Sequence, residues 1–98
     1  MSYTKDTIDG KAVVRIDTSL TIYDVPALHE EFINCFGNGT EVTVHMGEVI
    51  EFDAAGLQLL CAACKNARED RQAFQVVGAS EAIMDALYRL GLDANEII

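Results

Sequence analysis

The chain has 98 residues, half of them hydrophobic and 23% charged, which is typical of one folded domain rather than a disordered segment. No apolar run reaches the roughly 18 residues that a transmembrane helix needs, and residues 1–6 lack the apolar stretch of a signal peptide. We therefore expect one domain over residues 1–98, located in the cytoplasm and not inserted in a membrane. Three cysteines without an export signal fit free thiols in a reducing compartment: Cys35, Cys61 and Cys64.

The formal charge is -9, and its distribution excludes several kinds of partner. No Lys or Arg occurs between Arg15 and Lys65, and all the charged residues of that stretch are acidic. Such a surface repels phosphate backbones and anionic headgroups, so it argues against nucleic acid and favours a basic protein surface as partner. The acidic residues are Asp17, Asp24, Glu30, Glu31, Glu41, Glu48, Glu51 and Asp53.

The first two elements form a predicted β-hairpin. Tyr3–Ile8 and Lys11–Asp17 are strand-like, and Asp9-Gly10 between them suits a two-residue type I′ turn. The first strand would form an antiparallel edge of the sheet, and this edge could pair with a second copy. The oligomeric state is left open.

Residues 18–23 are predicted to form a loop that leads into the first helix. Asp24 is the expected N-cap, and Pro26 falls in the first turn, where its missing amide proton costs little. Gly37 or Gly39 would end the helix. Apolar residues at helical spacing define its inward face: Val25, Leu28, Phe32 and Cys35.

The alternation in Glu41–Met46 predicts a strand, with Val42, Val44 and Met46 directed inward. A loop over residues 47–52 follows, with Val49, Ile50 and Phe52 near its end. Some of these should anchor the loop, and an exposed one would be a natural contact residue. Asp53 is the expected N-cap of the second helix, whose inward stripe is Leu57, Leu60, Cys61 and Cys64.

Phe74–Val77 is predicted to be the last strand, and Ser80 caps a third helix that Gly91 ends. The inward face of this helix would be Ile83, Leu87 and Leu90. The order is therefore β-β-α-β-α-β-α. Strands separated by helices imply parallel crossovers, so we expect an α/β domain with a mixed, mostly parallel sheet and helices packed on it.

Residues 52–60 read Phe-Asp-Ala-Ala-Gly-Leu-Gln-Leu-Leu, directly after the loop and opening the second helix. This segment resembles the signature of the STAS domain family, which includes anti-sigma factor antagonists and domains of sulfate transporters. The residues that match the signature are Phe52, Asp53, Ala55, Gly56 and Leu57. The order of elements extends the resemblance over residues 8–92, including Arg89-Leu90-Gly91-Leu92 at the end of the third helix.

The resemblance implies a non-enzymatic regulatory module that binds a partner protein at the N-terminal end of the second helix. In phosphorylatable relatives a partner kinase modifies the serine that follows the Asp, but this chain has Ala54 there and Ala55 next. A methyl group cannot accept a phosphoryl group, so we expect the switch to be absent and the docking surface to be kept. The residues assigned to partner binding are Thr21, Tyr23, Glu51, Asp53, Ala54, Ala55, Gly56, Leu57 and Gln58.

Other functional interpretations are weaker. Cys61 and Cys64 have redox or zinc spacing but lie on the apolar stripe of a helix, without a second ligand pair, so we expect buried thiols and no metal site. Asp24 and Asp53 have sufficient roles as caps, so we expect no catalytic residues. Hydroxyls in the 18–23 loop could be phosphorylated, although turn formation explains them more simply. No cofactor is expected.

Three alternatives concern the partner. The segment Leu20-Thr21-Ile22-Tyr23 resembles STAS proteins encoded beside chemotaxis genes, so the partner could be a chemotaxis component instead of an anti-sigma factor or its serine-kinase relatives. STAS domains also serve anion or lipid transporters, so the chain could be a subunit that regulates one. A sensor of a small ligand is the third possibility.

Overall fold

In a computed structural model, which describes residues 3–91, the chain forms an α/β domain with helices packed on a mixed sheet. Leu92 and the expected end of the domain at residue 98 lie outside the described residues. The main sheet has the strand order β1-β2-β4-β6, in which the first pair is antiparallel and the other two are parallel. The fold class predicted from the sequence is therefore confirmed.

The opening hairpin consists of β1 (Tyr3–Ile8) and β2 (Lys11–Ile16). Asp9 has φ 52° and Gly10 has φ 77°, so both turn residues adopt the left-handed backbone that a type I′ turn requires. Strand β1 is one edge of the sheet, as predicted, and β6 (Phe74–Val77) is the other among the described residues.

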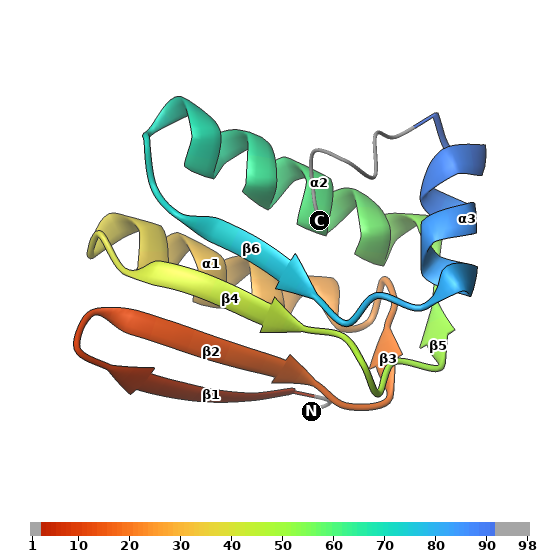
Figure 1. Ribbon diagram of the computed structural model, residues 1–98, viewed down its shortest axis with the longest axis horizontal. Coiled ribbons are helices and arrows are strands. Elements are labelled where there is room, and N and C mark those ends of the chain that lie inside the picture. Colours follow the sequence, from red (N-terminus) through yellow and green to blue (C-terminus); the bar gives the residue numbers. More distant parts are fainter. Residues whose placement is uncertain (1–2, 92–98) are drawn as a thin grey trace.

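Two short strands were not predicted. Ser19–Leu20 (β3) lies within the expected loop before the first helix, and Glu51–Phe52 (β5) lies within the expected loop before the second. They pair in parallel, with Ser19 opposite Glu51 and Leu20 opposite Phe52. This pair joins the two loops at the end of the sheet from which the helices start (Figure 1).

Helices α1 (Val25–Gly37) and α2 (Ala54–Glu69) contact each other and pack on β4 (Glu41–His45) and β6, respectively. All the described residues classed as buried are apolar, including most of the predicted inward positions. Burial of these side chains is the main stabilising contribution to such a fold. Fully buried side chains from the sheet and the helices include Val14, Leu28, Val42, Val44, Met46, Leu57, Leu60 and Val76.

The third helix, α3 (Glu81–Arg89), begins as predicted, with Ser80 Oγ accepting a hydrogen bond from the amide of Ile83 at 3.3 Å. Ile83 and Leu87 are buried, but Leu90 is 41% exposed. The helical stripe ends before Leu90, because the last helical residue is Arg89 and the chain turns at Gly91 with φ 75°. The predicted inward position of Leu90 is therefore wrong.

No helix in residues 3–91 is long and apolar enough to cross a membrane.

A cluster of groups between β1 and α1 makes folding sensitive to alkali. Lys5 Nζ lies 3.0 Å from a Glu31 carboxylate oxygen, and this hydrogen bond raises the pKa of the lysine. Burial raises the pKa of the Tyr3 phenol and of the Cys35 thiol. A group with a raised pKa holds its proton more tightly in the folded chain than in the unfolded chain. Stability is therefore lost as pH rises through the titration of these groups.

We expect the free energy of unfolding to decrease from about pH 8.5 upward, because the unfolded thiol titrates first and the phenol and ammonium groups follow near pH 10. Urea unfolding followed by circular dichroism at several pH values would measure this. The variant Cys35→Ala should be less stable at neutral pH. Its free energy of unfolding should decrease less steeply between about pH 8.5 and 10, where the thiol titrates. A stability that stays constant up to pH 11, or rises, would contradict the argument.

Candidate functional site

The candidate site is built around the carboxylate of Asp53, which joins α2 to the loop before α1. Asp53 has an extended backbone, and its Oδ1 accepts a hydrogen bond from the amide of Gly56 at 2.9 Å, so the predicted N-cap is confirmed. Its other oxygen, Oδ2, accepts a hydrogen bond from the amide of Ile22, also at 2.9 Å. One side chain therefore caps the helix and fixes a loop that lies 31 residues earlier in the chain.

Gly56 allows β3 to lie against the first turn of α2. A Cβ atom at this position would lie 2.1 Å from the carbonyl oxygen of Leu20 and 2.7 Å from its carbonyl carbon. Any side chain at residue 56 would thus collide with backbone, which cannot move aside as a flexible side chain can. The amide of Asp53 donates to the same Leu20 carbonyl at 3.3 Å. Leu20 and Leu57 are both buried beside this contact.

The loop before α1 is held by a second carboxylate. Oδ2 of Asp24 accepts hydrogen bonds from the Thr21 amide at 2.8 Å, the Thr21 hydroxyl at 3.1 Å and the Ser19 hydroxyl at 3.0 Å. The Asp24 side chain makes no capping hydrogen bond to α1, and its backbone is already helical. Asp24 therefore occupies the predicted N-cap position, but its carboxylate bonds to the loop that precedes the helix instead of capping the first turn.

The structure brings most of the predicted partner-binding residues together at the N-terminal end of α2 and on the adjacent loops. Ala54 is the first residue of α2 and is exposed, as are Glu51 and Gln58. Ala55 and Thr21 are half-buried. Gly56 and Leu57 are buried, so they support the helix end and offer no side-chain contact to a partner.

Large apolar side chains are exposed beside this helix end. Tyr23 is 91% exposed, Ile50 82% and Ile22 58%. Tyr23 was predicted from the sequence as a contact residue, whereas Ile22 was missed because one apolar residue in a loop has no periodic signal. Among Val49, Ile50 and Phe52, Val49 is the buried anchor, and Ile50 is the exposed residue that the sequence analysis anticipated.

The cysteines do not form a site. Cys35 and Cys64 are buried, Cys61 is half-buried, and all three are thiols rather than halves of a disulfide. Cys64 Sγ accepts a hydrogen bond from Arg68 at 3.7 Å. Within residues 3–91 no group of three or more His, Cys, Asp or Glu side chains could hold a metal ion.

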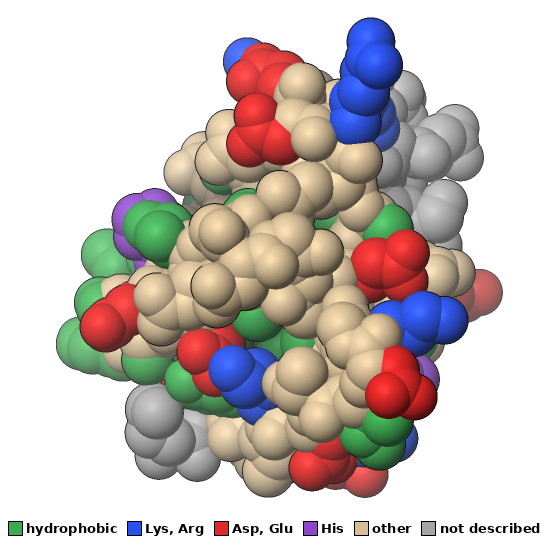
Figure 2. All heavy atoms as spheres, turned by 90° about the vertical axis from the view of Figure 1, so that its left-hand side faces the viewer, with side chains coloured by type: hydrophobic (Ala, Val, Ile, Leu, Met, Phe, Trp, Pro, Cys, Tyr) green, Lys and Arg blue, Asp and Glu red, His purple; other side chains and the backbone are tan. Residues whose placement is uncertain are grey.

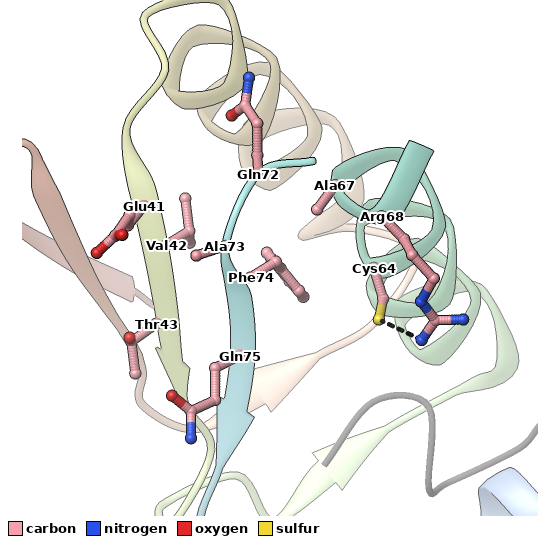
Figure 3. Close-up of a pocket in the computed structure, with 10 residues that line it drawn as sticks. All are labelled: Glu41, Val42, Thr43, Cys64, Ala67, Arg68, Gln72, Ala73, Phe74 and Gln75. Carbon is pink, nitrogen blue, oxygen red and sulfur yellow. Dashed lines mark hydrogen bonds between the residues drawn. The ribbon is translucent and has the colours of Figure 1, made fainter. Parts of the chain in front are cut away.

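A pocket of about 470 Å³ lies between β6 and the C-terminal half of α2, away from Ala54 (Figure 3). Phe74 points across it toward Cys64, whereas Glu41 and Thr43 point away on the far side of β4. Gln72 donates from Nε2 to the Phe36 carbonyl at 2.7 Å, and its Oε1 is buried without a hydrogen-bond partner among the described residues. Because the polar side chains do not converge, the pocket lacks the arrangement expected of a ligand site.

Comparisons with known proteins agree with this geometry. The family model described as Mlab, STAS domain matches residues 4–98. No curated protein matches the chain.

Three solved structures share the fold. The anti-sigma factor antagonist SpoIIAA in its unphosphorylated form has a TM-score of 0.75 at 13% identity, covering 92% of this chain and 84% of that chain. An anti-sigma factor antagonist from Mycobacterium paratuberculosis has a TM-score of 0.76 at 20% identity. The match covers 95% of this chain and 80% of that chain. A variant of RsbS from Moorella thermoacetica has a TM-score of 0.82 at 20% identity. The match covers 99% of this chain and 84% of that chain.

At these identities the structural similarity establishes the fold, and the family match over residues 4–98 establishes the family. The chain belongs to the STAS domain family.

Proposed function

We propose that the chain is a cytoplasmic, non-enzymatic regulatory module that binds a partner protein through the N-terminal end of α2 and the loops beside it. The observation that carries the proposal is the exposed first turn of α2. There Ala54 is accessible, and the helix end is held in place by the two hydrogen bonds of Asp53. A rigid, accessible surface of this kind can bind a partner with little loss of conformational entropy.

The proposed module differs from phosphorylatable relatives at one position. SpoIIAA, whose fold the chain shares, is described in an unphosphorylated form. In this chain the residue that follows Asp53 is Ala54, which has no hydroxyl, so the proposed module binds its partner without a phosphorylation switch at this residue. An anti-sigma factor, a serine-kinase relative, a chemotaxis component or a transport complex would use the same surface, and the genes encoded beside this one distinguish these partners.

Replacing Ala54 with Glu tests the surface. The carboxylate would lie in the first turn of α2, where the helix dipole favours negative charge, so folding should be preserved. Binding to a purified partner encoded by a neighbouring gene should weaken about tenfold or more, because the larger charged side chain must be desolvated in the interface. Titration calorimetry would measure the affinity.

The matched control is Ala62→Glu, which places the same side chain at an exposed position two turns further along α2. This control should bind like the unmodified chain. Equal affinities for Ala54→Glu and the unmodified chain would contradict the proposed surface. Ala54→Ser adds a second test, since its phosphorylation by a kinase encoded nearby would identify that kinase as the partner class.

A further inference from the structure

Three exposed apolar residues lie in the two loops that the β3–β5 pair joins, Ile50 before the pair and Ile22 and Tyr23 after it. These two strands pair with each other, and the amides of Ile50 and Glu51 both donate to the Thr18 carbonyl, at 3.0 and 3.2 Å. We call Ile22, Tyr23 and Ile50 the apolar ridge.

Hydrogen bonds fix the backbone of the ridge while its side chains remain exposed. The amide of Ile22 is bonded to Asp53, and the amide of Tyr23 donates to the Thr21 hydroxyl at 3.3 Å. The same hydroxyl donates to Asp24, so the turn is held from two sides. Large apolar side chains on a preorganised backbone are typical of residues that dominate the energy of a protein interface.

Acidic residues lie close to the ridge in sequence. Glu51 follows Ile50 directly, Glu48 lies two residues before it, and both are exposed; Asp24 follows Tyr23. The nearest Lys or Arg in sequence to any ridge residue is Arg15, which lines a small cavity together with Glu48. An apolar surface with acidic residues around it is complementary to an apolar segment flanked by basic residues.

We infer that the apolar ridge is the anchor of the interface, and that its occupant is an apolar segment of a partner protein flanked by lysine or arginine residues. This inference rests on the proposed function and specifies the chemistry of the partner. The ridge side chains set how slowly the complex dissociates, and the acidic residues around the ridge set how fast it forms and how strongly salt weakens it. An anionic membrane is disfavoured, because these acidic residues would be repelled by its headgroups.

The test uses random peptides displayed on phage and selected on the unmodified chain, followed by synthesis of the enriched peptides. Their affinities are measured by fluorescence anisotropy over a range from about 50 to 300 mM salt, across which surface charges are increasingly screened. Enriched peptides should combine aromatic or aliphatic residues with Lys or Arg. Their affinity should decrease about tenfold or more in Tyr23→Ala and in Ile50→Ala, and should also decrease as salt increases.

The matched control is Ile8→Ala, because Ile8 is 70% exposed but lies next to the hairpin turn, at the opposite end of the sheet from β3 and β5 (Figure 1). Its peptide affinity should equal that of the unmodified chain. Enrichment of acidic peptides, or of peptides that bind Tyr23→Ala and Ile50→Ala normally, would overturn the inference. So would binding to phosphatidylglycerol vesicles, or a dimer in sedimentation experiments that Tyr23→Ala dissociates.

The partner-binding experiment separates this inference from the proposed function. If Ala54→Glu weakens binding to the neighbouring-gene partner but Tyr23→Ala and Ile50→Ala do not, the end of α2 is the interface and the ridge is not its anchor. If none of the three variants weakens binding, both are wrong.

Discussion

Replacing Gly56 with Ala should destabilise the domain by roughly 3 kcal/mol, at the upper end of the range for overpacked sites. The new Cβ would lie 2.1 Å from the Leu20 carbonyl oxygen, so either β3 or the first turn of α2 must move. Movement of β3 would also weaken its pairing with β5 and the Asp53 amide bond to Leu20. Thermal unfolding should show a melting temperature lower by roughly 10 to 20 °C.

Gly37 provides the control for this substitution. It is the last residue of α1, and a Cβ there would meet nothing within 4 Å. Gly37→Ala should therefore be neutral or slightly stabilising, because alanine has the higher helix propensity. A Gly56→Ala variant that unfolds within about 0.5 kcal/mol of the unmodified chain, the spread expected of surface substitutions, would show that the contact with β3 relaxes easily.

The buried faces of the longer strands and helices could be predicted from the sequence, whereas the two-residue strands β3 and β5 could not. The inward positions Val42, Val44 and Met46, and Leu57 and Leu60, follow periods of two and of 3.6 residues over whole elements, and all five are buried. β3 and β5 have two residues each, which is too short for any periodic pattern. They exist because their backbones pair with each other across more than thirty residues of sequence.

Asp24 and Asp53 also differ in a way that the local sequence did not predict. Both precede helices and both were predicted as N-caps, because Asp at such a position commonly accepts an amide hydrogen bond from the first turn. Asp53 does so, but Asp24 bonds to Ser19 and Thr21 instead. A side chain of this type can bond to the preceding loop as easily as to the helix, and local sequence does not distinguish the two outcomes.

The position of Ala54 at the helix start was predicted from the motif, but the connection to Ile22 was not. The Asp53–Ile22 hydrogen bond depends on the β3–β5 pairing, which places the two loops side by side. The candidate site therefore combines a local helix cap with a tertiary contact between two loops. The Asp53 carboxylate makes both, since one oxygen accepts from Gly56 and the other from Ile22. Substitutions at Asp53 can therefore separate the capping bond from the loop bond.

Asp53→Ala should destabilise the domain by about 2 to 3 kcal/mol, which combines the loss of a helix cap with the loss of a charge-assisted hydrogen bond to the loop. Asp53→Asn should cost less, because an amide oxygen can still accept from Gly56 whereas the amide nitrogen cannot accept from Ile22. Urea unfolding would rank the two variants, and amide hydrogen exchange at Ile22 should be faster in both.

Ser80→Ala is the matched control, because the Ser80 side chain caps a different helix, α3, through its hydrogen bond from the amide of Ile83. It should cost about 1 kcal/mol, as the loss of one cap does, and leave exchange at Ile22 unchanged. If Asp53→Asn leaves Ile22 as protected as in the unmodified chain, the bridging bond does not hold the loop. The preorganisation of the apolar ridge would then have to come from Asp24 and the β3–β5 pair alone.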